Sequence, residues 1–263
     1  MTLTLNKGFW LPAGGGASEA SVEAQGTLST GYSGTMDKNF VVGGNWHPSS
    51  SYQPHGCFNG QIDSARISDI NRYTSATSAG DTISIPSSEF TTDSATIYLM
   101  NFNAASLANP DEPSSISADS SYYSNTNNRD TTNTMFSSAA AWTGGTSKAA
   151  LEYGSPSALN ALFNLAYNDA WTFECFVRPT ALLSVDGFNI GMALTNYVSY
   201  PQFQLGLLHS SGALYAYCTW WHSGSGYVAL TGSTNISGGL NAWYYLAMTN
   251  TAAGNFCLIM GAV

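Results

Sequence analysis

The fold class of this chain is decided by the stretch Trp171-Thr172-Phe173-Glu174-Cys175-Phe176-Val177-Arg178-Pro179. Apolar residues occupy its odd-numbered positions up to 177, and polar residues stand at 172, 174 and 178. A period of two is the pattern of a β-strand that turns one face toward a core and the other toward solvent. We therefore expect a half-buried strand over residues 171–179.

A second strand pattern lies far upstream, in Phe58-Asn59-Gly60-Gln61-Ile62-Asp63-Ser64-Ala65-Arg66-Ile67-Ser68. Its apolar residues are even-numbered at the start and odd-numbered by Ala65 and Ile67. An alternating pattern that changes phase requires one extra residue in the strand. We therefore predict a β-bulge near Asp63 and Ser64.

Two hairpins follow the first stretch along the chain. Alternating apolar residues over 203–207 and 214–220 flank a turn at Ser211-Gly212, and apolar runs over 243–248 and 256–260 flank Gly254. Residues 157–167 are the sole candidate for a helix. This regular alternation of strands and turns predicts an all-β sandwich.

The composition is that of a folded chain with an unusually neutral surface. Of its 263 residues, 9 % are charged, 13 % are aromatic and 44 % are hydrophobic. Ordinary soluble domains carry about 25 % charged residues. The aromatic and hydrophobic content is enough for a core, so Ser, Thr, Asn, Gln and Gly must cover the surface. Such a composition is typical of extracellular adhesins and viral fibres.

The charge balance argues against nucleic acid as a partner. The formal net charge is −9, and the 7 basic residues are scattered along the chain, whereas phosphate binding requires clustered Lys and Arg. No apolar run approaches the ~18 residues of a membrane span, so we expect none. Residues 1–10 lack the pattern of a signal peptide. A surface protein of this kind would be released by lysis, as a phage virion component is, or would be a segment of a longer protein.

The four cysteines, Cys57, Cys175, Cys218 and Cys257, are far apart in the sequence. No Cys-x-x-Cys spacing occurs, which argues against a zinc knuckle or a redox motif. Three of them lie inside apolar strand patterns, so we expect free, buried core cysteines. A disulfide is the alternative, and its pairing cannot be deduced from the sequence.

These stretches resemble laminin-G-like (concanavalin-A-like) lectin and glucanase domains. Residues 171–179 are similar to the opening Phe-Thr-Ile-Glu-x-Trp-Val-x-Pro strand of that family, and residues 243–249 to its Trp-Tyr-His-Val-Ala-Leu-Thr strand. Residues 58–68 resemble its closing Phe-x-Gly-x-Ile-Asp-x-x-Arg-Ile-Ser pattern. The resemblance covers roughly residues 35–75 and 96–263. It implies an antiparallel jelly-roll β-sandwich, of the kind that phage structural and fibre proteins often carry.

The order of the two patterns is reversed in this chain, because the closing pattern precedes the opening one. We assign residues 1–90 to the closing half of a sandwich and residues 91–263 to its opening and middle strands. Half a sandwich would expose an apolar face and unpaired strand edges. The halves could complete each other within the chain in permuted order, or between subunits, or with sequence outside this chain. Either of the first two alternatives predicts hydrogen bonds between residues 58–67 and 171–177.

Two segments share a composition that suits sugar recognition. Each places Trp-His beside small polar residues: Trp46, His47 and Tyr52 in one, and Trp220, Trp221 and His222 in the other. Exposed aromatic rings stack on the apolar faces of sugars, and hydroxyl and amide groups bind their rims. These six residues are our candidate carbohydrate contacts. The alternative is that Trp46 and Trp220 pack in the core or against loops.

A calcium site is a weaker prediction. Asp119-Ser120-Ser121-Tyr122 resembles the Asp-Ser-Ser-Gly-Asn-Gly stretch that often follows the first strand in the family, and oxygen-rich loops can bind calcium. The Gly-Asn-Gly part is absent here, and Asp119 is the sole local acid. We therefore expect no cofactor and a turn-forming Asp119, with calcium at Asp119 as the alternative.

Asp63 and Arg66 match the closing motif of the family, and we expect them to be structural, pairing with other groups or bonding loop backbone. Enzymes of the family use a Glu-x-Asp-x-Glu strand, and no Glu-x-Asp occurs in this sequence. A Gly-x-Ser-x-Gly elbow and a phosphate loop are also absent from it. We therefore expect no enzymatic activity.

Together these features predict a non-enzymatic virion structural or display protein, such as a capsid decoration, a fibre or a tail-associated subunit. It would act at the virion surface or in the extracellular space, and its partners would be other virion subunits, including copies of itself. The alternative is a glycan-binding adhesin, a receptor-binding module that uses the Trp-His segments on host-surface glycans.

Overall fold

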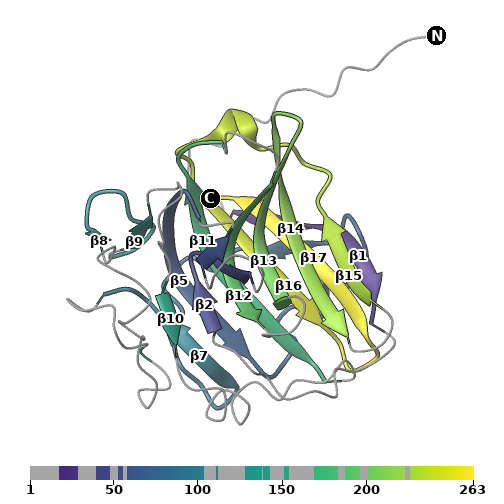
Figure 1. Cartoon of the computed structure of the whole chain (residues 1–263). Helices are drawn as coiled ribbons and strands as arrows, with labels where there is room; N and C mark the ends of the chain where they lie inside the picture. The colour runs from purple at the N-terminus through teal and green to yellow at the C-terminus, as the bar shows by residue number, and fades with distance from the viewer. Residues whose placement is uncertain are drawn as a thin grey trace.

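Two antiparallel β-sheets dominate the computed structural model of the chain (Figure 1). No α-helix occurs among the residues that the structure describes. The described residues are 18–28, 40–47, 53–55, 58–103, 111, 128–137, 139–142, 151–153, 169–182, 187–195, 201–222 and 226–263. The predicted all-β class is thus confirmed for this part of the chain, and the candidate helix over 157–167 lies outside it.

In the part of the chain that the structure describes, the first sheet has nine strands. Its order is β6 (Thr82–Ser84), β1 (Glu19–Thr27), β17 (Asn255–Ala262), β16 (Tyr244–Asn250), β11 (Trp171–Pro179), β5 (Gly60–Ser68), β9 (Ala139–Trp142) and β8 (Asn128–Asp130), and β7 (Thr96–Met100) also pairs with β5. The side of β5 that does not face β11 therefore pairs with two strands, β9 near its start and β7 near its end.

The second sheet has six strands among the residues described above. Its order is β10 (Leu151–Tyr153), β2 (Phe40–Val42), β12 (Gly187–Thr195), β13 (Pro201–Ser210), β14 (Ala213–His222) and β15 (Gly226–Thr231). A separate small hairpin joins β3 (Asn45–His47) to β4 (Gln53–His55), and one turn of 3-10 helix, η1, covers Ser237–Gly239. The predicted hairpins are confirmed as β13–β14 and β16–β17.

The two stretches that were predicted to pair, residues 58–67 and 171–177, meet inside this one chain. Strand β5 holds the closing pattern and pairs antiparallel with β11, the opening pattern, from Ser68 opposite Thr172 to Gly60 opposite Pro179. The predicted hydrogen bonding between these two stretches is confirmed. Strand pairing on the other side of β11 brings in β16, so segments from residues 1–90 and 91–263 share one sheet.

The predicted bulge is also confirmed. The register between β5 and β11 shifts so that Ser64 and Ala65 together stand opposite Cys175. Ser64 takes a positive φ of 49°, a conformation that non-glycine residues rarely adopt. The shift places Ile62 and Ala65, three residues apart, in the same core, which is what a phase change in the apolar pattern requires.

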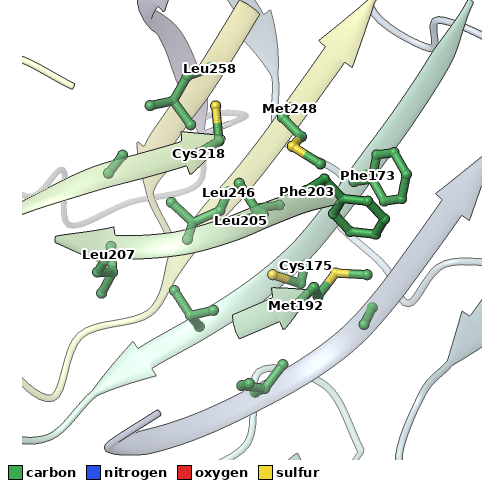
Figure 2. Close-up of a cluster of buried hydrophobic side chains, with 14 of the residues drawn as sticks. Phe173, Cys175, Met192, Phe203, Leu205, Leu207, Cys218, Leu246, Met248 and Leu258 are labelled. Atoms are coloured by element: carbon green, nitrogen blue, oxygen red, sulfur yellow. The ribbon is translucent and has the colours of Figure 1, made fainter. Parts of the chain in front are cut away.

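The main core lies between the two sheets, as Figure 2 shows. Phe173, Cys175, Leu246, Met248 and Leu258 of the first sheet face side chains of the second sheet. The labelled partners from that sheet are Met192, Phe203, Leu205, Leu207 and Cys218. This packing of two inner faces is the architecture of a β-sandwich. At about 25 cal/mol per Å² of apolar area buried, such a core is the main source of stability.

The three cysteines that the structure describes are free, as predicted. Cys175, Cys218 and Cys257 are unpaired and buried, and burial raises the pKa of all three thiols. A raised pKa keeps the thiol protonated and poorly nucleophilic. Cys57 lies outside the described residues.

The outer face of the first sheet departs from the prediction. Thr172 and Glu174 were expected to face solvent from a half-buried strand, but both are fully buried. A second apolar cluster covers this face, in which Phe176 and Tyr245 of the sheet pack with Phe90 from the connection between β6 and β7. The half-buried prediction was wrong because this connection and the segment after β5 lie over the strand. Ile70 and Arg72 of that segment bond Thr172, and Tyr73 bonds Glu174.

Candidate functional site

The predicted sugar-binding segments both belong to the second sheet or lie against it. Trp46 and His47 are in β3, and the β3–β4 hairpin lies against β12 and β13. Trp221 and His222 end β14, opposite Tyr227 and Gly226 of β15. Tyr52 and Asp119 lie outside the described residues.

Trp220 is a core residue. Its side chain is 4 % exposed and stacks on Trp171, with ring centroids 4.6 Å apart and an interplanar angle of 17°. It also lies parallel to Phe203 at 6.5 Å. A ring covered in this way has no free face for a sugar, so we do not retain Trp220 as a carbohydrate contact. Its position on the inward side of β14 follows from the alternation of that strand.

A different aromatic residue is exposed on the second sheet. Phe188 of β12 is 40 % exposed and lies against Tyr217 of β14, with ring centroids 4.8 Å apart. In sequence Phe188 alternates in phase with Met192, which is buried in the core. A register shift between Ile190 and Met192 places Phe188 opposite Leu208 and Met192 opposite Leu205, on opposite faces of the sheet. This bulge explains why the sequence pattern did not reveal an exposed Phe188.

Glu174 is the centre of a buried polar cluster on the outer face of the first sheet. Its Oε1 lies 2.7 Å from Nη2 of Arg66 and accepts a hydrogen bond from Arg66 Nε at 2.8 Å. Its Oε2 accepts hydrogen bonds from the hydroxyls of Tyr245, at 2.6 Å, and Tyr73. The guanidinium of Arg66 also lies 4.4 Å from the ring centre of Phe90. The charge of Glu174 is thus met by the guanidinium of Arg66, by the more distant Nε of Arg72 at 3.9 Å from Oε1, and by two hydroxyl donors.

The two phenols of this cluster remain donors at neutral pH. Burial raises the pKa of Tyr73 and of Tyr245, and the neighbouring carboxylate of Glu174 raises both further. Charged hydrogen bonds in a medium of low dielectric are strong when every partner is satisfied. Glu174 therefore ties β11 to β5, β16 and the residues that follow β5.

Arg72 connects this buried cluster to an exposed ion pair at the surface. Its Nε donates to Ser68 Oγ at 2.6 Å, and its Nη1 and Nη2 donate to the two carboxylate oxygens of Asp93 at 2.9 and 2.8 Å. This bidentate pair lowers the pKa of Asp93, whose side chain is 47 % exposed. The Arg72–Asp93 pair joins the segment after β5 to the connection between β6 and β7, and both lie over the outer face of the first sheet.

The side chain of Asp63 holds a second covering segment, around Met135 and Phe136, through the backbone N–H groups of that segment. Its Oδ2 accepts hydrogen bonds from the N–H groups of Met135, at 3.1 Å, and Phe136, at 3.0 Å. Its Oδ1 is buried and has no hydrogen-bond partner among the described residues. Burial raises the pKa of Asp63 to about 7, and the charge of Glu89 also raises it. Asp63 and Arg66 therefore bond loop backbone and a buried partner respectively, and neither side chain is exposed.

The described residues hold no group of three or more His, Cys, Asp or Glu side chains placed to bind a metal ion. In the same part of the chain, no helix has the length and apolar character needed to span a membrane. No protein-family model, curated protein or solved structure matches this chain.

Proposed function

We propose that this chain is a non-enzymatic structural or display subunit of a virion, folded as a permuted concanavalin-A-like jelly roll. The resemblance of β5 and β11 to the closing and opening strands of that family supports the fold, since the two strands lie side by side. The buried carboxylates Glu174 and Asp63 support a structural role, because both are engaged in holding covering segments on the first sheet.

The observation that carries the proposal is the distribution of charge. No Asp, Glu, Lys or Arg occurs after Asp186, so strands β12–β15 of the second sheet are free of charged side chains. Burying a charge against a partner costs free energy unless it is paired, and the centres of protein interfaces are depleted of charge. The uncharged strands β12–β15 of a chain of net charge −9 are therefore suited to lie against neighbouring subunits.

The test of this role is the location of the protein. An antibody against the chain should label particles purified from a culture that produces it, at a constant number of copies per particle. Recovery of folded protein in the soluble fraction alone, with unlabelled particles, would contradict the proposal.

Glycan binding is the second candidate, and a specific observation favours it. Both Trp-His segments belong to the second sheet or lie against it, and Phe188 is exposed on the same sheet. A neutral surface with aromatic rings suits an uncharged polysaccharide.

Binding of the isolated protein to host-surface polysaccharides tests this candidate, with calcium and with a chelator. An adhesin should lose binding in Trp46→Ala, Trp221→Ala or Phe188→Ala. Ile70→Ala is the matched control, because Ile70 is 41 % exposed and lies after β5 of the first sheet. Loss of binding in the chelator would indicate a calcium ligand such as Asp119. No binding by folded protein would leave the structural role.

A further inference from the structure

The edges of the two sheets are protected to different degrees. A strand that pairs on one side presents unpaired N–H and C=O groups to any other strand, and natural proteins shield such edges with short strands, charges, proline or bulges. In the first sheet, β6 has three residues and Pro86 follows it, and β8 has three residues that include Arg129 and Asp130. Strand β7, which shares one side of β5 with β9, is shielded by Asp111, whose N–H donates a hydrogen bond to Leu99 O at 2.9 Å.

The second sheet has one shielded edge and one open edge. Strand β10 has three residues and includes Glu152. Strand β15 has six residues, Gly-Tyr-Val-Ala-Leu-Thr, without charge or proline. Its pairing with β14 runs from Gly226 to Thr231 without a register shift. Among the described residues, no strand pairs with its other side.

Strand β15 is packed against the first sheet on its inner face, and its outer face is exposed to solvent. Strand β1 of the first sheet lies against β15, as Figure 1 shows at one side of the sandwich. A Cβ atom at Gly26 of β1 would lie 3.2 Å from side-chain atoms of both Val228 and Leu230, so glycine permits this close packing. Ala229 and Thr231, which alternate with those residues, are exposed.

The segment after β15 is also fixed. Both carboxylate oxygens of Glu23 in β1 accept hydrogen bonds from this segment, including those from the N–H groups of Ser233, at 3.1 Å, and Thr234, at 3.0 Å. A strand anchored on its inner face and at its end is a rigid template, which loses little conformational freedom when another strand pairs with it.

We propose that β15 pairs antiparallel with β15 of a second copy of this chain, joining two second sheets into one continuous sheet. Charge favours β15 over other parts of the surface as the place where two copies meet. Two copies of a chain of net charge −9 repel each other, but no charged residue follows Asp186, so β15 brings no like charges together. An antiparallel pair of identical strands obeys a two-fold axis, which is the commonest symmetry of protein dimers. This inference rests on the proposed role as an assembly subunit.

The experiment measures the mass of the full chain by light scattering and sedimentation over a range of concentrations. Wild-type protein should form a dimer, and Ala229→Lys should reduce the mass twofold, because a lysine on an edge strand opposes pairing. Thr82→Lys on the edge strand β6 is the matched control: Thr82 is also exposed, and this variant should remain dimeric. The thermal midpoint of each variant shows that it is folded.

Amide hydrogen exchange of the wild-type protein gives an independent measurement, should a variant fail to fold. The amides of residues 226–231 should exchange more slowly as concentration rises, whereas those of 82–84 should not change. A wild-type monomer at all concentrations would overturn the proposal, and so would a dimer that Ala229→Lys leaves intact. Neither measurement uses particles or a glycan, so a monomer would reject the edge pairing while particle labelling still tests the proposed function.

Discussion

The two sheets of this sandwich bury their strands by different means. The first sheet is covered on both faces: its inner face packs in the main core, and its outer face is covered by connecting segments that Glu174, Arg72 and Asp63 hold in place. The strands β12–β15 of the second sheet carry no charged residue, expose Phe188, and end in the open edge of β15.

The difference separates two uses of polar residues. A chain with so few charges places several of them where they tie its own segments together, so the first sheet is completed from within the chain. Strands β12–β15 of the second sheet carry neutral polar and aromatic groups, whose burial costs little free energy because no charge is desolvated. Changes that remove charge should therefore have their largest effects on stability in the first sheet.

Glu174→Ala should cause the largest loss. It leaves Arg66 buried without its carboxylate and removes the acceptor of two tyrosine hydroxyls. Breaking a buried ion pair from one side costs about 3–5 kcal/mol. The measurement is the free energy of unfolding from urea denaturation. Glu19→Ala removes the same charge from an exposed side chain of β1 and should change stability by less than about 0.5 kcal/mol; equal losses in the two variants would contradict the role of the cluster.

Asp63→Asn should change how stability depends on pH. The pKa of Asp63 is raised from 3.8 to about 7 in the folded chain, so between these values the native state holds a proton that the unfolded state releases. The free energy of unfolding therefore falls as pH rises from 4 to 8, by about 2–4 kcal/mol. Asparagine keeps an oxygen for the N–H groups of Met135 and Phe136 but does not titrate, so this fall should disappear.

The control for that experiment is Asp69→Asn, since Asp69 is exposed near the end of β5. It should keep the wild-type dependence of stability on pH. Asp93, whose pKa is lowered by Arg72, loses its stabilising charge as pH falls below its ordinary value, outside the interval from pH 4 to 8. A slope that survives in Asp63→Asn would show that another group binds the proton.

Gly60→Ala should be costly because of a close approach between β5 and β11. Gly60 has a φ of +149°, and an added Cβ would lie 2.0 Å from the carbonyl oxygen of Arg178. The clash adds to the ~1–3 kcal/mol of strain in such a backbone conformation. Gly80→Ala is the matched control, because Gly80 has a φ of +92° with no atom within 4 Å of the added Cβ. Urea denaturation should show a larger loss for Gly60→Ala, and similar losses would contradict the close approach.

The sequence alone was sufficient to predict the strands that show a clear period of two. The phase change over residues 58–68 located the bulge at Ser64. The pairing of β5 with β11 was predicted by two of the three ways in which the reversed patterns could be completed, and that prediction depended on the resemblance of both strands to a known family. The bulge depends on local alternation, so a single chain contains that information. The pairing required the strand order of the family as well as the need to complete a sandwich.

The cover of the first sheet could not be predicted in this way. Tyr73 and Phe90 lie in segments without strand periodicity, and their contacts with β5 and β11 join residues up to 101 positions apart. An alternating strand gives the same pattern whether its polar face meets solvent or a covering segment. The buried ion pair of Arg66 with Glu174 thus became visible only in the structure.

Phe188→Ala should have the smallest effect on stability, and it tests whether the second sheet keeps an exposed aromatic residue for a partner. Phe188 is 40 % exposed and contacts Tyr217, so its loss should cost about 0.5–1 kcal/mol. Phe173→Ala, the matched change at a fully buried position of β11, should cost about 3–5 kcal/mol. Urea denaturation of both variants measures the contrast. A loss in Phe188→Ala as large as that in Phe173→Ala would mean that the ring supports the fold from within, and the outer face of the second sheet would then resemble the covered face of the first.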